Sequence, residues 1–249
     1  VGRAGLVTRG ELPLEPPLDA ILERWTARRA AGEPLAYIVG YRDFWTLRLA
    51  VTPAVLVPRP ETELLVERAL ALAPQCGADG SVVSLADLGT GSGAIALALA
   101  SERPDWKIVA TDRSAAALDV AQLNARSHRL RNVQFLHGDW FEPLRGRRFD
   151  LVVSNPPYVA ADDPVLGADS LRVEPREALT PGTDALAALA ALVESAPLHL
   201  VPDGWLLLEH GATQATAVAG RLVARGFRHV RSHADLAGSQ RVTEGQWSR

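Results

Sequence analysis

Between residues 81 and 232, short apolar runs alternate with longer segments of helical period, and this alternation constrains the fold more than any other feature. The strand candidates span residues 81–88, 107–111, 133–137, 150–154, 205–209 and 227–232. The helix candidates span residues 93–101, 115–128, 184–195 and 213–225. Such a pattern predicts an α/β fold of βαβ units, whose mostly parallel sheet is covered by helices on both faces. Ligands bind such sheets at the carboxyl ends of the strands.

Composition is that of an ordinary globular protein, with 249 residues, 47% hydrophobic residues and a formal net charge of −3. A chain of this size can bury its own core without disulfides or a structural metal. Cys76 is the single cysteine, so it cannot pair within the chain, and a cysteine-based zinc site is excluded. The six histidines show no metal-site spacing either. We expect no metal and a reducing compartment.

Charge and hydropathy limit the classes of partner that the chain can bind. A slightly negative chain does not hold duplex nucleic acid by its overall charge, because phosphate binding requires an excess of Lys and Arg. No apolar run reaches the ~18–20 residues of a membrane span, and the N-terminus lacks a signal-like apolar core. We therefore expect a cytoplasmic protein without membrane contact.

The first sixty residues differ from the rest. Residues 1–33 contain one short amphipathic helical pattern around Leu22 and Trp25, which is too little to bury a core alone. Residues 34–59 alternate in a way that predicts a β-hairpin or two short strands, at 44–51 and 54–58. An acidic, proline-led helix start follows at residue 60.

A glycine-rich loop follows the first strong strand and leads directly into an apolar helix. It consists of Gly89, Thr90, Gly91, Ser92 and Gly93. Alternating glycines permit a tight turn and close ligand approach, and the helix N-terminus offers free N–H groups. The Gly-x-Gly-x-Gly spacing differs from the dinucleotide pattern and favours a cofactor without a pyrophosphate. Taken alone, the loop is equally consistent with a turn that binds nothing.

Acids also follow the next two strands. Asp112 stands 19 residues after Gly93, where a carboxylate can accept hydrogen bonds from both ribose hydroxyls. It could equally cap the helix that begins near Ser114. Asp139 and Trp140 follow the third strand and could bind an adenine amino group and cover its ring, although packing alone would also explain the tryptophan.

The fourth strand leads into Asn155, Pro156, Pro157 and Tyr158, the most informative tetrapeptide of the chain. Two prolines remove two backbone donors and leave carbonyl acceptors displayed in a rigid turn. The Asn side chain adds an acceptor, and the Tyr ring adds a flat surface. Such a site suits a planar group that bears an –NH₂.

Together these motifs resemble the class I S-adenosylmethionine-dependent methyltransferases that modify planar nitrogens. Enzymes acting on adenine, guanine and the glutamine amide share the tetrapeptide, so it does not choose among them. Further segments distinguish among these enzymes. They lie at residues 32–40, 44–45, 56–63, 174–179 and 206–211. They resemble the peptide chain release factor glutamine methyltransferase family (the HemK/PrmC type) from about residue 32 to the C-terminus.

The resemblance implies a Rossmann-like fold with a mostly parallel, seven-stranded sheet. It implies methyl transfer from S-adenosylmethionine to the glutamine amide in the Gly-Gly-Gln motif of bacterial release factors, with no direct nucleic-acid substrate. The residues implied for the cofactor are Gly89, Thr90, Gly91, Ser92, Gly93, Asp112, Asp139, Trp140 and Asn155. Asn155, Pro156, Pro157 and Tyr158 are implied for the substrate, and Asn155, Pro156 and Tyr158 for catalysis.

The implied domains are a truncated helical substrate-docking domain at 1–33, a hairpin linker at 34–59 and a methyltransferase domain at 60–249. The chain contains no methionine, even at position 1, which agrees with an incomplete N-terminal domain. Arg59 and Glu61 could position a protein substrate or simply belong to a helix start. Glu209 and His210 favour a supporting role over acid–base chemistry.

The alternative function is an adenine-N6 or guanine-N2 methyltransferase of nucleic acid that uses the same tetrapeptide. Such an enzyme must extract a base from its stack and commonly carries a basic face. The basic run at 145–148 favours this alternative, whereas the net charge opposes it.

Overall fold

The computed structural model describes residues 16–72 and 82–248. Cys76, Ser81 and the first fifteen residues of the predicted docking segment lie outside these ranges. Seven strands form one sheet in the order β5, β4, β3, β6, β7, β9, β8. Their bounds are β3 Ser84–Leu88, β4 Lys107–Asp112, β5 Val133–His137, β6 Phe149–Ser154, β7 Leu200–Glu209, β8 Phe227–Ala234 and β9 Gln240–Trp247.

The sheet confirms the predicted mostly parallel α/β architecture. The pairs from β5 through β7 are all parallel, whereas β9 pairs antiparallel with both β7 and β8. Strand β9 is absent from the sequence expectation because its pattern is polar. Its Glu244 is nevertheless buried, since Arg68 donates two hydrogen bonds to the carboxylate at 3.0 and 3.1 Å.

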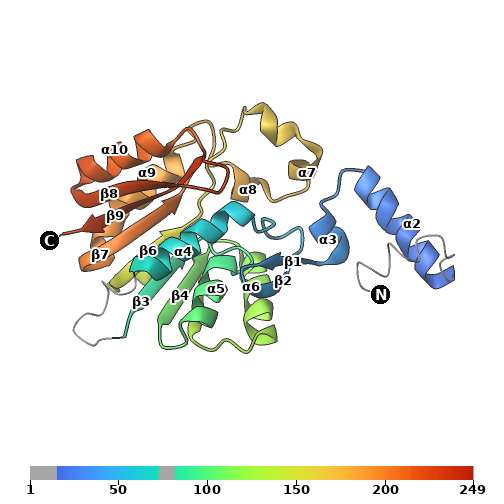
Figure 1. The fold of residues 1–249 in the computed structure, drawn as a ribbon, viewed down its shortest axis with the longest axis horizontal. Helices are drawn as coiled ribbons and strands as arrows, with labels where there is room; N and C mark the ends of the chain where they lie inside the picture. Colours follow the sequence, from blue (N-terminus) through green and yellow to red (C-terminus); the bar gives the residue numbers. More distant parts are fainter. Residues whose placement is uncertain (1–15, 73–81, 249) are drawn as a thin grey trace.

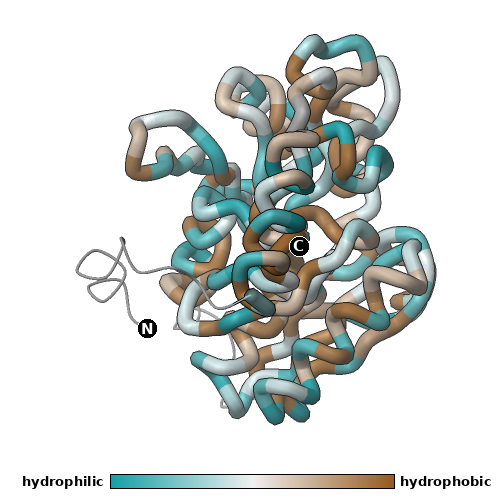
Figure 2. The backbone as a smooth tube through the Cα atoms, turned by 90° about the vertical axis from the view of Figure 1, so that its right-hand side faces the viewer, coloured by the Kyte–Doolittle hydropathy of each residue, from teal (hydrophilic) through white to brown (hydrophobic). Residues whose placement is uncertain are grey.

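Helices cover both faces of this sheet (Figure 1). The helices α4 (Glu63–Leu72), α5 (Ala94–Glu102) and α6 (Ala115–Ser127) pack on one face, and α9 (Ala187–Ser195) and α10 (Ala215–Arg225) pack on the other. Successive residues of β7 alternate between the two cores, with Leu207 in one and Leu206 and Leu208 in the other. Figure 2 shows hydrophobic segments running through the centre of the body.

Short helical turns occupy several connections. They are η1 Pro60–Thr62, η3 Glu142–Leu144, η4 Pro164–Gly167, α7 Asp169–Arg172, α8 Arg176–Leu179 and η5 Ala196–Leu198. None of the helices within the described ranges is long and apolar enough to cross a membrane.

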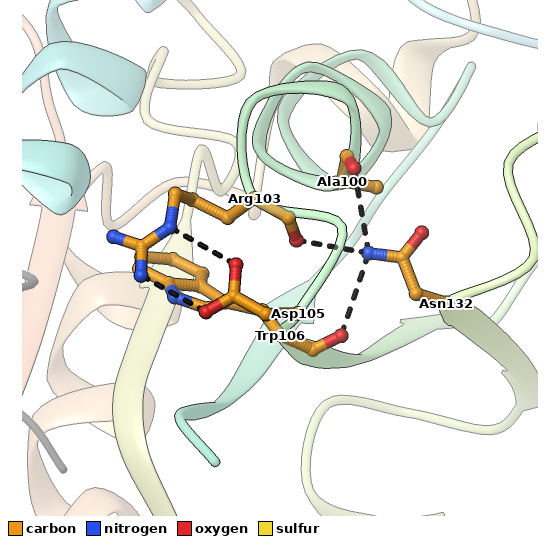
Figure 3. A network of polar contacts seen from close by, with 5 residues as sticks. All are labelled: Ala100, Arg103, Asp105, Trp106 and Asn132. Carbon is orange, nitrogen blue, oxygen red and sulfur yellow. Dashed lines mark hydrogen bonds and ion pairs between the residues drawn. The ribbon is translucent and has the colours of Figure 1, made fainter. Parts of the chain in front are cut away.

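A single side chain organises the passage from α5 into β4 (Figure 3). The Asn132 amide donates to the carbonyls of Arg103 at 3.1 Å and of Ala100 and Trp106 at 3.4 Å each. These carbonyls belong to the end of α5 and the turn that follows it, where the helix leaves acceptors unpaired. The nearby ion pair of Arg103 with Asp105 is exposed and contributes little.

The N-terminal part departs from the expected strand positions. Helix α2 (Pro16–Ala30) and helix α3 (Leu35–Val39) precede a hairpin of β1 (Tyr41–Phe44) and β2 (Leu47–Ala50). The predicted hairpin is present within residues 34–59, but its strands lie at 41–44 and 47–50 and not at 44–51 and 54–58. Trp45 adopts a left-handed φ of 54° and forms the turn, so the hairpin begins earlier. Residues 54–58 lie between two prolines and form no strand.

Helix α2 lies apart from the sheet and buries none of its residues (Figure 1). The residues that make its apolar stripe remain exposed, including Leu18, Leu22 and Trp25.

A buried amide attaches the hairpin to the glycine loop. The Asn124 side chain, from α6, accepts from the Ala50 N–H at 2.7 Å and donates to the Ala50 and Ser92 carbonyls at 3.0 and 2.9 Å. Only 1% of Asn124 is exposed, so water cannot replace these bonds. This one side chain therefore sets where the end of β2 lies relative to the loop at residues 89–93.

We expect Asn124→Ala to leave three backbone groups without partners and to lower the free energy of unfolding by about 2–4 kcal/mol. Thermal denaturation should show a midpoint about 5–10 °C lower. Ser127→Ala, which removes an exposed hydroxyl from the same helix, should change the stability by less than about 0.5 kcal/mol. Equal effects of the two substitutions would contradict the role given to Asn124.

Candidate functional site

A cavity of about 640 Å³ lies at the carboxyl ends of β3, β4 and β6, within the size range of pockets that hold cofactors. The residues predicted for the site that line it are Gly89, Thr90, Gly91, Ser92, Asp112, Asp139, Trp140, Asn155 and Pro157. Gly93, Pro156 and Tyr158 are not part of its wall. The tertiary structure thus brings together most of a residue set that spans nearly seventy positions of the sequence.

The glycine loop needs glycine for different reasons at different positions. All three glycines have left-handed φ values, 71° at Gly89, 56° at Gly91 and 85° at Gly93. A Cβ on Gly89 would lie 3.1 Å from the Trp140 ring, so the loop could not approach this ring with a larger residue. A Cβ on Gly91 would meet no atom within 4 Å. Gly91 therefore presents its backbone to open space in the cavity wall.

A buried carboxylate supports the loop from below. Asp87 accepts hydrogen bonds through Oδ2 from the Thr90 hydroxyl at 2.7 Å and from the Ala96 N–H at 3.2 Å. Its Oδ1 is buried without a partner among the described residues. Burial raises the pKa of Asp87 to about 7, with the two hydrogen bonds opposing the shift. Asp87 thus joins the loop to the first turn of α5.

Asp112 connects the loop to the next strand. Its Oδ2 accepts from the Gly91 N–H at 2.9 Å and its Oδ1 from the Ser114 N–H at 2.8 Å. The N-cap of α6 is Ser114, whose hydroxyl accepts from Ala117 N, so Asp112 is not the cap. Each carboxylate oxygen keeps a further lone pair for a ligand. Burial raises the pKa of Asp112, while both backbone hydrogen bonds lower it.

Trp140 stands in a strained conformation beside the cavity. Its φ of 44° is left-handed, and the Thr111 hydroxyl donates to its carbonyl at 3.0 Å. The ring contacts Gly89 and lines the cavity together with Asp139. An aromatic surface and a carboxylate thus lie side by side in the wall.

Asn155 presents one face of its amide to the cavity. Its Nδ2 donates to the Thr62 hydroxyl at 3.1 Å, and no hydrogen bond from another described residue reaches its Oδ1. Pro156 is buried, and its carbonyl accepts no hydrogen bond within the described ranges. Neither oxygen has a hydrogen-bond partner among the described residues.

Tyr158 has a different environment from the one expected. Its ring packs against the core under α9 and α10, and its hydroxyl donates to Glu209 Oε1 at 3.3 Å. Burial raises the pKa of this hydroxyl well above its usual range. The two prolines turn the backbone, so the Tyr158 side chain that follows them points into the protein.

One ion pair and one backbone hydrogen bond, both to Glu174, place the linker over the cavity. Arg59 lines the cavity and forms a 2.6 Å ion pair with Glu174, which also accepts from the Val57 N–H at 3.0 Å. Glu174 has a fully buried side chain. It therefore joins the exit of the hairpin to the segment at 174–179. Glu61 lies in the short helix η1 and does not line the cavity.

Sequence reasoning missed Thr62 and Glu174 as members of the site. Both belong to segments that carried the family resemblance, 56–63 and 174–179, and this was the available signal. The segments contribute further lining residues, among them Leu56, Pro58, Pro175, Arg176 and Glu177. Within the described ranges, no group of three or more potential metal ligands occurs.

Comparisons with known proteins identify the relatives of this chain. A family model described as the methyltransferase small domain matches residues 62–182, and one described as the PrmC N-terminal domain matches residues 1–40. The solved structure of a 16S rRNA N2 methyltransferase from T. thermophilus aligns with a TM-score of 0.58 at 22% identity, covering 83% of this chain and 49% of that one. At this identity the likeness shows the fold alone.

The relatives by sequence are much nearer. The release factor glutamine methyltransferase of Xylella fastidiosa (strain Temecula1) is 50% identical over 98% of this chain and 87% of its own length. That of Pseudomonas aeruginosa is 51% identical over 90% of this chain and 79% of its own length. The chain therefore belongs to the release factor glutamine methyltransferase family.

Proposed function

We propose that this chain transfers a methyl group from S-adenosylmethionine to the side-chain amide nitrogen of the glutamine in the Gly-Gly-Gln motif of bacterial peptide chain release factors. One observation carries the proposal besides the family. Asn155 reaches the wall of the cavity with its amide oxygen free and its amide nitrogen bound to Thr62. An –NH₂ group needs such an acceptor. The proposed location is the cytoplasm, because release factors belong to the translation machinery.

The residues around the glycine loop fit the nucleoside part of the cofactor. Asp112 has lone pairs left for two ribose hydroxyls, and Gly91 allows close approach because no side chain stands there. Asp139 and Trp140 would hold the adenine amino group and ring. When bound, S-adenosylmethionine supplies a sulfonium methyl, whose bond to sulfur breaks as the bond to nitrogen forms, with the electron pair kept by sulfur.

The protein must aim a poor nucleophile. An amide nitrogen shares its lone pair with the carbonyl, so geometry and electrostatics have to supply what basicity does not. The Asn155 oxygen and the Pro156 carbonyl would accept the two N–H hydrogens and direct the nitrogen at the methyl group. Positive charge developing on the nitrogen strengthens both hydrogen bonds, which stabilises the transition state more than the bound substrate. The displaced proton leaves to solvent.

Tyr158 would act from behind this turn. Its half-buried ring packs against the core, whereas the sequence suggested direct packing on the substrate amide. The proposed substrate contacts are therefore Asn155, Pro156 and Pro157, with Tyr158 in support.

The proposed organisation of the chain follows the sequence division. Residues 1–33 would belong to a substrate-docking domain, residues 34–59 would form the linker, and residues 60–249 the methyltransferase domain. The match of residues 1–40 to the PrmC N-terminal domain supports this division. The exposed apolar stripe of α2 also supports it, because a docking domain presents such surfaces.

A direct assay separates the proposed substrate from nucleic acid. The protein is incubated with labelled S-adenosylmethionine and either a bacterial release factor, DNA or RNA, and mass spectrometry locates the methyl group. We expect one methyl group on the motif glutamine, and none on a release factor in which this glutamine is replaced by alanine. Methylation of nucleic acid alone would overturn the proposal.

Asn155→Ala removes the acceptor that aims the substrate nitrogen. We expect kcat to fall by about 10²–10³-fold, as when one preorganised hydrogen-bonding group is lost. The dissociation constant for S-adenosylmethionine, measured by calorimetry, should change much less. Equal losses in both would show that Asn155 mainly builds the cofactor pocket.

Gly91→Ala and Gly146→Ala form a matched pair for the cofactor site. Both glycines have left-handed φ values and open space around the Cβ position, so each substitution should cost about 1–2 kcal/mol of stability. Only Gly91 lines the cavity. We therefore expect Gly91→Ala alone to weaken S-adenosylmethionine binding, by about tenfold or more, the equivalent of 1.4 kcal/mol. Similar binding by the two variants would place the cofactor elsewhere.

A further inference from the structure

The turn that carries the two proposed substrate acceptors cannot hold itself in place through its own N–H groups. Pro156 and Pro157 have no N–H, so neither can donate a hydrogen bond to a neighbouring segment. The Asn155 oxygen and the Pro156 carbonyl have no hydrogen-bond partner among the described residues. The position of both oxygens therefore depends on what holds the two ends of the turn.

The first end of the turn is attached to the strand that leads into the glycine loop. Ser154, the last residue of β6, is fully buried, and its hydroxyl donates to the Leu88 carbonyl at the end of β3 at 2.7 Å. Asn155 follows and donates to the Thr62 hydroxyl through Nδ2 at 3.1 Å. These contacts fix where the turn begins, whereas its other end, at Tyr158, is held by different residues.

A side chain from outside the cavity wall holds this second end. Gln214 Nε2 donates to the Tyr158 carbonyl at 3.0 Å, and Gln214 Oε1 accepts from the Gly211 N–H at 2.8 Å. Gln214 is the N-cap residue of α10 and does not line the cavity. The Tyr158 hydroxyl also donates to Glu209 Oε1, at the longer distance of 3.3 Å. The Gln214 amide thus joins the backbone of the turn to the segment between β7 and α10.

The two backbone partners allow the Gln214 amide only one orientation. A carbonyl can only accept and an N–H can only donate, so the nitrogen must face Tyr158 and the oxygen must face Gly211. The side chain also fits closely. A Cβ on Gly211 would lie 3.2 Å from Gln214 Oε1 and 3.3 Å from its Cδ, so a larger residue would push the amide from its place.

Gln214 connects the turn to a fixed part of the fold. The next hydrogen bond along the chain, from the Val159 N–H to the Leu179 carbonyl at 3.1 Å, reaches only the four-residue helix α8 beside the cavity. Helix α10, by contrast, is held against the sheet by Val218 and Leu222, which are both fully buried. The start of this helix is therefore a rigid support for the turn.

We propose that Gln214 is a positioning residue for the methyl transfer, which sets where the Asn155 oxygen and the Pro156 carbonyl lie by holding the Tyr158 carbonyl. This inference rests on the proposed function and deepens it, because it gives a residue outside the cavity wall a role in the same reaction. Both acceptors must meet the two hydrogens of one –NH₂ group, so a shift of about 1 Å at the turn misaligns the nitrogen and the methyl group.

Gln214→Glu removes one hydrogen bond of this arrangement and leaves the other. A carboxylate has nearly the same shape and still accepts from the Gly211 N–H, but it has no hydrogen for the Tyr158 carbonyl. The added negative charge is favourable at the start of a helix. Because the lost bond and the gained charge offset each other, we expect a melting temperature within about 4 °C of the wild type.

Activity should respond differently from stability. We expect kcat of Gln214→Glu for a release factor to fall by about 10–100-fold, because the two acceptors are displaced from the reacting nitrogen. The dissociation constant for S-adenosylmethionine, measured by calorimetry, should stay at the wild-type value. The loss should fall on kcat more than on KM, since a protein substrate binds through many contacts besides one amide.

Gln246→Glu is the matched control. Gln246 lies in β9, outside the cavity wall, and its Nε2 donates to the Asp203 carbonyl, also at 3.0 Å. The substitution removes the same kind of hydrogen bond and adds the same charge. A general effect of either change would therefore appear in both variants, whereas we expect Gln246→Glu to keep the wild-type kcat.

Gln214→Met separates the lost bonds from the added charge. Methionine has a similar length, removes both hydrogen bonds of the amide and carries no charge. We expect kcat to fall at least as far as in Gln214→Glu, with a lower melting temperature because the Gly211 N–H also loses its partner. Gln246→Met is its control and should keep the wild-type kcat.

The inference is overturned if Gln214→Glu keeps the wild-type kcat, or if Gln246→Glu loses as much kcat as Gln214→Glu. It is also overturned if cofactor binding by Gln214→Glu weakens in proportion to kcat, because Gln214 would then support the cofactor pocket. Should Gln214→Glu not fold, Gln214→Met decides by the same criteria. A wild-type protein that methylates no release factor would refute the proposed function itself, whereas fully active Gln214 variants would refute only the role of Gln214.

Discussion

Parallel pairing of β3 with β4 on one side and β6 on the other is the constraint on which the rest of the structure depends. In this register Leu88, the last residue of β3, lies opposite Thr111 and Ser154. The three chain segments that follow these residues therefore emerge at one edge of the sheet. They carry the glycine loop, Asp112 and Asn155. A shift of either strand would separate the cofactor residues from the residue that aims the substrate.

Buried polar side chains then attach the remaining segments to this edge. Asn124 connects the end of β2 to the glycine loop, and Glu174 holds Val57 and Arg59 over the cavity. Such groups are costly to bury unless every hydrogen bond is made, so each of them specifies one arrangement of the segments it joins. The linker is thereby part of the cavity wall, although it lies far from the motifs in the sequence.

The shape of the cofactor site depends on carboxylates that accept hydrogen bonds from the backbone around them. Asp87 and Asp112 accept from backbone N–H groups of the loop and of the helix starts, and this fixes the shape of the cofactor site. A carboxylate can only accept, so Asp87 and Asp112 decide how the N–H groups around them must be arranged.

The sequence by itself determined the α/β architecture, the strand ends that carry the chemistry, and the family. These are local properties, because apolar periodicity, glycines that need left-handed φ and a Pro-Pro turn are written in consecutive residues. Strand β9 could not be found in this way, since its buried Glu244 is stabilised by Arg68 from a distant helix. The hairpin was misplaced because Trp45, with its left-handed φ, makes a turn that the alternating pattern conceals.

Only the tertiary structure decided which side chains meet. Tyr158 belongs to the most informative motif, yet its ring packs in the core, because its backbone turns away from the cavity after the two prolines. Thr62 and Asn155 stand 93 positions apart in the sequence, and only the fold brings the Thr62 hydroxyl within hydrogen-bond distance of the Asn155 amide. Long-range packing, which leaves no local pattern, is the physical reason that the sequence could not reveal this contact.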